Sequence, residues 1–232
     1  MLAAVASSAY GDILVDSFDR EVGLIEHRRK AGTDRDDQLD AFSKLLARNP
    51  EHPRRAEVML KLATLFRHQP IGGKADLASA MDWYRKAAEN SRSGSSVWAE
   101  AVLEQSSLLM QDKQIGEAEN LALDVKKYSK DVLDRTRANE KLLSIAVDAE
   151  NLRLALRYCD EIMGADIKDA ATATQLRISS NQRAQLFHMY LVLTSSKLPG
   201  TKKLLDELRA KHGRMLAPLQ RQIEGPNPGD GP

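Results

Sequence analysis

The chain has 232 residues, of which 42% are hydrophobic, enough for a packed core, and its formal net charge is +1. This charge predicts no general attraction to nucleic acid or an acidic membrane surface, and no apolar run reaches the roughly 18 residues of a membrane span. The single cysteine, Cys159, excludes an internal disulfide framework and a multi-cysteine metal site.

Small residues dominate the start of the chain. The stretch LAAVASSA resembles the last part of a signal peptide, although the basic segment and full apolar segment that come earlier in such peptides are missing. We interpret residues 1–9 as a flexible N-terminus, with an exported, periplasmic protein favoured over a cytoplasmic one. The alternative is the frayed terminus of a cytoplasmic protein.

Apolar residues at three-to-four-residue steps then predict helices in pairs. The first pair covers residues 14–25, ending near Gly32, and 36–46, closed by Asn49-Pro50. The second covers 53–66 and 76–88, which the loop HQPIGGK separates.

Two further pairs follow. The third covers residues 98–109 and 115–128, with a turn at Asp112-Lys113. The fourth covers 142–147 and 155–162, with a turn at Glu150-Asn151. A small residue opens the second helix of three successive pairs, at Ala80, Ala118 and Ala155, with spacings of 38 and 37 residues.

Helix pairs at such a period are typical of an α-solenoid, because one pair cannot cover both of its apolar faces and must stack on a neighbour. An irregular helical bundle, in which the alanines share a period by chance, remains the alternative. The large share of Ala and Leu and the aromatic content of 5% favour helices over sheets in either case.

The pattern loosens beyond Gly164. We expect a helix from Asp166 through Leu176, a strongly apolar helix over residues 182–193, and a last one over 203–211 with Gly213 as a stop. These form a fifth, capping pair. The sequence thus predicts one helical domain over residues 10–213 and a flexible tail over 214–232.

The second pair resembles the tetratricopeptide repeat (TPR). Met59, Leu62, Ala63 and Phe66 stand at the large, Leu, small and aromatic positions of the first helix of that repeat. Ala80, Tyr84 and Ala87 match its second helix, and AMDWYRKAAE is also similar to the second helix of Sel1-like repeats. The resemblance covers about residues 36–163 at falling quality, and it implies an all-α, right-handed superhelix of four to five pairs with an inner groove.

Catalytic and metal chemistry find no support in the sequence. The five histidines are scattered, with no pair spaced to present two imidazoles on one helical face, and we expect no metal and no cofactor. We place His52 in a loop and expect His188 to be partly buried. Cys159 occupies a position where small apolar side chains pack, which favours a structural role over a nucleophilic one.

The resemblance also implies which side chains line the inner groove. These positions are Glu57, Thr64, Arg67, Glu100, Ser107, Gln111, Arg137, Glu140 and Ser144. Their mixed charge departs from the Lys and Asn residues with which some TPR proteins clamp a C-terminal carboxylate. A second interpretation is that these side chains are merely solvated.

The sequence therefore predicts a non-catalytic scaffold that binds a peptide or partner protein in the groove. The alternative is a structural, self-associating component of the bacterial cell envelope, which an exposed apolar strip at Leu186, Phe187 and Tyr190 would favour. An enzyme would require a cleft with several strongly shifted titratable groups.

Overall fold

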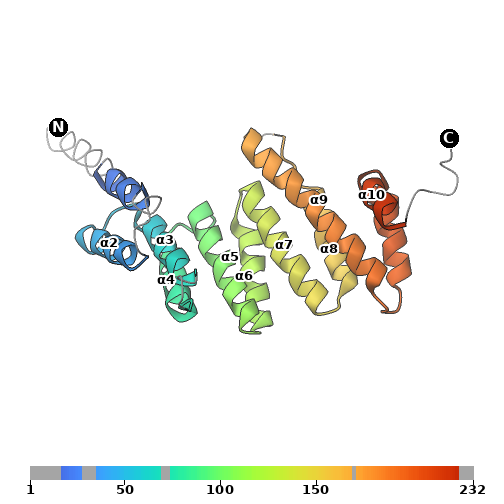
Figure 1. Cartoon of the computed structure of the whole chain (residues 1–232), viewed down its shortest axis with the longest axis horizontal. Helices are drawn as coiled ribbons and strands as arrows, with labels where there is room; N and C mark the ends of the chain where they lie inside the picture. Colours follow the sequence, from blue (N-terminus) through green and yellow to red (C-terminus); the bar gives the residue numbers. More distant parts are fainter. Residues whose placement is uncertain (1–16, 28–34, 69–73, 169–170, 225–232) are drawn as a thin grey trace. The chain divides into compact units, whose positions relative to one another are not determined.

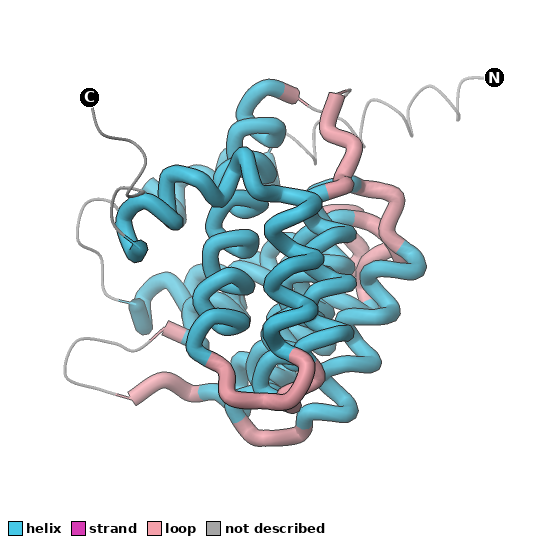
Figure 2. The backbone as a smooth tube through the Cα atoms, turned by 90° about the vertical axis from the view of Figure 1, so that its right-hand side faces the viewer, coloured by secondary structure: helices cyan, strands magenta, loops and turns pink. Residues whose placement is uncertain are grey.

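The computed structural model describes residues 17–27, 35–68, 74–168 and 171–224. Every regular element in these ranges is a helix, which confirms the predicted all-α class (Figures 1 and 2). None of the helices in these ranges combines the length and apolarity that a membrane crossing requires. The predicted N-terminal segment, residues 1–9, and residues 225–232 of the predicted tail lie outside the described part of the chain.

Contacts between backbone segments group the chain into two compact units, Met1–Leu108 and Leu109–Pro232. The boundary falls inside one helix, α5 (Ser96–Gln111). The single domain expected over residues 10–213 stays a prediction.

The first unit contains helical residues 17–27, α2 (Arg35–Arg48), α3 (Arg55–Arg67), α4 (Leu77–Glu89) and most of α5. Helices α3 and α4 pack against each other, as the second predicted pair requires. Ala63 on α3 and Ala80 and Ala87 on α4 are completely buried. Because an alanine projects only a methyl group, these positions let the two helices approach closely, and Tyr84 fills the space beside them.

The helix of residues 17–27 packs on α2 and α3 through apolar side chains. Phe18 and Ile25 are 3% and 9% exposed, and they join a core that includes Phe42, Leu45 and Leu62. Fully burying a side chain of this size contributes roughly 1.5–3 kcal/mol. The predicted first pair, residues 14–25 with 36–46, is confirmed in its described part.

Ion pairs also cross the contact made by this helix. Its acidic residues pair with bases of the α2–α3 region: Asp19 with Arg54, Glu21 with Arg48, and Glu26 with Lys61. Every partner in these pairs is more than a third exposed. Exposed pairs contribute about 0–1 kcal/mol each, so the apolar contacts carry most of the docking energy.

The second unit contains α6 (Ile115–Tyr128), α7 (Val132–Asp148), α8 (Leu152–Met163), α9 (Thr172–Ser195) and α10 (Thr201–Glu224). Each of these helices packs against the next one in the chain. Alternate helices also touch, α7 with α9 and α8 with α10. Figure 1 shows α7, α8 and α9 side by side.

Two helix turns of the second unit share one geometry. Lys113, after α5, and Glu150, after α7, both adopt a positive φ, 61° and 57°. In the first turn the N–H of Gln114 donates to the carbonyl of Leu109, and in the second the N–H of Asn151 donates to that of Ala146. This long turn-closing bond, together with a left-handed residue, is a common way to end a helix. The same hydrogen-bonded turn therefore recurs after 37 residues, at both positions where the sequence predicts a turn.

The C-terminal helices differ from the prediction in two places. In place of the expected helices 166–176 and 182–193 there is one helix, α9, which begins at Thr172 and continues through residues 177–181, where no Gly or Pro interrupts it. The expected stop at Gly213 is instead a kink at His212, whose φ is −124°, and helical structure resumes to Glu224. Residues 214–224, which were expected to belong to the flexible tail, are therefore helical.

The apolar strip proposed for self-association is not exposed. Leu186 and Tyr190 are completely buried and Phe187 is half-buried, because α8 and α10 pack against α9. His188, expected to be partly buried, is exposed. The specific feature that would favour an envelope-assembly role is thus missing from these residues.

Replacing the left-handed residue of a turn with glycine should stabilise the protein. A left-handed conformation costs an L-residue about 1–2 kcal/mol, and glycine removes this cost. Part of the gain is offset because glycine also makes the unfolded chain more flexible. We expect Glu150→Gly and Lys113→Gly to raise the melting temperature by about 1–3 °C each, measured by circular dichroism. Ala149→Gly, at a neighbouring residue with a negative φ, is the control and should lower it. A decrease for both turn variants would contradict this account.

Candidate functional site

Three of the residues expected in the groove meet around one buried tyrosine in the first unit. Tyr84 of α4 is 1% exposed, and burial raises the pKa of its hydroxyl. Hydrogen bonding to Thr64 and Arg67 of α3 opposes this shift, and the negative charge of Glu100 on α5 adds to it. Arg67 also forms an ion pair with Glu104 of α5. Side chains from three helices are therefore held together at this point.

The other two predicted groove residues of this unit have structural roles. Glu57 binds the guanidinium of Arg54, with 2.9 Å between Arg54 Nε and Glu57 Oε1, and Arg54 in turn pairs with Asp19. Ser107, which the sequence analysis places among exposed positions, is 6% exposed, and its hydroxyl donates to the Leu103 carbonyl of its own helix at 2.8 Å. The exposure predicted for Ser107 is wrong.

The predicted groove residues of the second unit lie on α5 and α7. Gln111 is exposed at the end of α5, whereas Arg137, Glu140 and Ser144 are half-buried along α7. Burial raises the pKa of Glu140, against the effects of a hydrogen bond with Asn181 of α9 and the positive charges of Arg137 and Lys141. Glu140 thus links α7 to α9.

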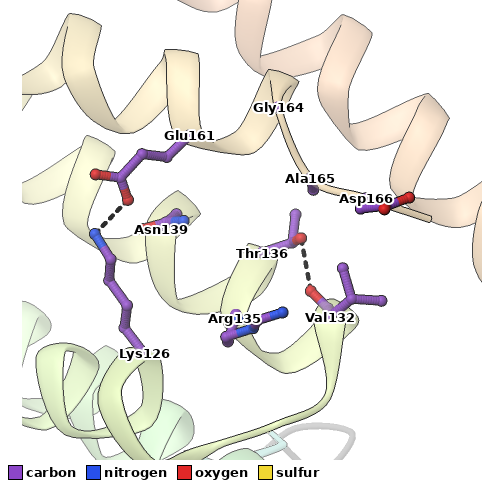
Figure 3. A pocket seen from close by; sticks show the side chains of 9 residues that line it. All are labelled: Lys126, Val132, Arg135, Thr136, Asn139, Glu161, Gly164, Ala165 and Asp166. Carbon is purple, nitrogen blue, oxygen red and sulfur yellow. Dashed lines mark hydrogen bonds and ion pairs between the residues drawn. The ribbon is translucent and has the colours of Figure 1, made fainter.

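A polar pocket of about 390 Å³ opens between α6, α7 and the end of α8 (Figure 3). It is lined by Lys126, Val132, Arg135, Thr136, Asn139, Glu161, Gly164, Ala165 and Asp166. Two bases and two acids lie among these residues, so their formal charges cancel. The lining consequently gives no electrostatic preference for an anion or a cation.

One ion pair spans this pocket. Lys126 of α6 binds Glu161 of α8, and its ammonium group also lies 4.9 Å from the centre of the Tyr158 ring. Beside them Asn139 is 7% exposed, and its Oδ1 atom is buried with no hydrogen-bond partner among the described residues. This oxygen is inaccessible to solvent, so a ligand in the pocket reaches it only if the pocket rearranges.

No local motif in the sequence indicates this pocket. Lys126 and Glu161 are 35 residues apart in the chain, and neither belongs to a motif that would connect them. Both residues lie in the last turns of second helices in successive pairs, α6 and α8. Aligning the two helix pairs on the turns at Lys113 and Glu150, which are 37 residues apart, would have indicated that Lys126 and Glu161 lie near each other.

Cys159 packs inside the second unit, as predicted from its position. It is completely buried, and burial raises the pKa of its thiol to about 12, with a smaller contribution from the charge of Asp160. Such a thiol remains protonated at neutral pH. Across the described ranges, no three His, Cys, Asp or Glu side chains are grouped so that they could hold a metal ion.

Cys159 should be almost inert in the folded protein. A rise of its thiol pKa from 9.0 to about 12 lowers the thiolate fraction by orders of magnitude, since each pKa unit is a factor of ten. We expect iodoacetamide to modify it at pH 8 at least about 100-fold more slowly than in the same chain unfolded in urea, as measured by mass spectrometry. Comparable rates in the two states would contradict the buried, protonated thiol.

No protein-family model, curated protein or solved structure matches this chain.

Proposed function

We propose that the protein is a non-catalytic interaction scaffold, a TPR-like solenoid whose first helices bind a peptide or a partner protein. In this proposal α3 and α5 of the first unit, and α7 and α9 of the second, supply the binding surfaces. The residues involved are Thr64, Arg67 and Glu100 in one unit and Arg137, Glu140 and Ser144 in the other.

The observation that carries this proposal is the regular stacking in the second unit. Helix α7 contacts α9 while α8 contacts α10, so alternate helices are neighbours. Stacked helix pairs with this connectivity place their first helices on one side and their second helices on the other. A row of first helices offers a partner a continuous, preformed surface.

A repeated sequence period supports the same proposal. The left-handed residues Lys113 and Glu150 are followed by buried alanines, Ala118 and Ala155, each five residues later. Turn geometry and helix contact thus recur together after 37 residues. This agreement between local turn and packing is expected when each pair is a copy of one structural unit.

The state of the polar side chains also favours binding by a rigid surface. Arg67 is held by Glu104, and Glu140 lies against Asn181, so these groups are ordered before any partner arrives. Preordered side chains lose less entropy on binding than free ones. Because these helices together carry both acids and bases, we expect a partner segment that carries both signs of charge.

Charge reversal on the first helices should weaken partner binding. We expect Arg67→Glu and Arg137→Glu each to reduce partner capture from the native organism's lysate by about tenfold or more, because an attractive contact becomes repulsive. Quantitative mass spectrometry of the captured proteins measures the loss. Circular dichroism checks that each variant is folded.

Two further variants serve as controls. Arg153→Glu reverses an exposed charge on α8, a second helix, and should leave capture unchanged. Arg67→Glu combined with Glu104→Arg restores the ion pair with its charges exchanged, and binding should stay weak even though the unit regains its stability. If all variants capture the same partners as the original chain, the first helices are not the binding surface.

A further inference from the structure

The first unit contains a histidine whose surroundings fit only the neutral ring. His52, in the loop between α2 and α3, is 8% exposed, and its ring stacks on Phe18 with 3.7 Å between centroids and 17° between planes. Phe18 is in turn the buried anchor of helical residues 17–27. His52 therefore lies directly under the contact that docks this helix.

Hydrogen bonding fixes which nitrogen of His52 carries the proton. The backbone N–H of Arg54 donates to His52 Nδ1 at 3.2 Å, so the proton of the neutral ring is on Nε2. A second proton would have to bind Nδ1, where it would point at the N–H that now donates to it. Nε2 is buried and has no hydrogen-bond partner among the described residues, so it gains nothing when the ring becomes charged.

The charged groups around His52 compensate one another. Asp19 faces it from the docked helix, and Glu57 and Arg54 face it from α3 and its N-terminus. Both acids are bound to the Arg54 guanidinium, which leaves little negative charge for a protonated imidazole. Burial is the largest effect on this group and lowers the pKa of His52 below its ordinary value of 6.5, with Arg54 acting in the same direction and the two acids opposing it.

We propose that His52 and Phe18 form an acid-sensitive latch, which releases residues 17–27 from α2 and α3 when the imidazole is protonated. Release uncovers the apolar surface of Phe42, Leu45 and Leu62, which Phe18 and Ile25 cover in the docked state. This inference is independent of the proposed binding function, since it uses none of the residues to which that function is assigned.

The direction of the pH effect follows from proton linkage. Above pH 6.5 the ring is neutral in the docked and released states alike, and pH has no influence through this group. As pH falls below 6.5 the released state binds a proton that the docked state does not, so docking weakens. Carboxylic acids in general titrate around pH 4, well below the range in which an imidazole titrates, so a test above pH 5.5 reports on the imidazole.

Amide hydrogen exchange tests the latch on the intact chain. Between pH 7.5 and 5.5, after correction for the intrinsic exchange rate, protection of residues 17–27 should fall about tenfold, while that of α7 and α8 stays constant. Unchanged protection of residues 17–27 over this range would overturn the proposal. So would an equal fall in α7 and α8, which would mean that the whole protein unfolds.

Three variants assign the effect to His52. His52→Phe retains an aromatic ring beside Phe18, and His52→Asn retains an acceptor for the Arg54 N–H. Neither side chain titrates, so protection of residues 17–27 should be independent of pH in both variants. His27→Asn removes an exposed histidine of the same helix and should retain the tenfold fall. A persistent fall in whichever His52 variant folds would show that another group is responsible.

Discussion

The close approach of paired helices at fully buried alanines is the constraint on which the rest of this structure depends. Ala80 on α4, Ala118 on α6 and Ala155 on α8 are each completely buried near the start of a second helix. A larger side chain at these positions would separate the helices or force strain into well-packed neighbours. Tyr84 and Leu108 pack beside Ala80, and Cys159 is buried one turn after Ala155. The polar contacts made by α3, α5 and α7 therefore depend on the same close spacing between paired helices.

Local patterns predicted a helix at the position of each of α2 to α8, although for α7 they gave only residues 142–147 of Val132–Asp148, and they did not predict the C-terminal end. In the earlier helices, apolar spacing and turn residues agree: Asp76 caps α4 by accepting from Ser79 N–H at 2.9 Å, and Asn151 accepts from Leu154 N–H at the start of α8. In α9, which no Gly or Pro interrupts, a contact with a distant part of the chain also contributes. Gln182, the expected first residue of the helix over 182–193, is buried and donates to the Ile162 carbonyl at the end of α8, which no local pattern indicates.

The candidate site was predictable only at the level of helix faces. Thr64, Arg67 and Glu100 were assigned to one helical surface, and in the structure all three act on the hydroxyl of Tyr84. The repeat offsets could not identify Glu104 as the partner of Arg67, since rotamers and the relative rotation of α3 and α5 decide that pair. Ser107 was predicted to be exposed for the same reason, because the sequence does not define the rotation of α5 about its axis. Its hydroxyl is instead buried and donates to the backbone of its own helix.

His212 and His52 differ in the charged groups that surround their rings. His212, at the kink of α10, has its Nε2 atom 3.1 Å from Asp160 of α8, where Lys211 binds as well, so an acid lies within reach of the ring. His52 contacts an aromatic ring and an N–H donor, and the nearest acids are already bound to Arg54. The helix over residues 17–27 is held mainly by apolar burial, and its exposed ion pairs add little. A new charge under Phe18 therefore acts on the strongest part of that contact, which is why one buried imidazole can govern the docking of a whole helix.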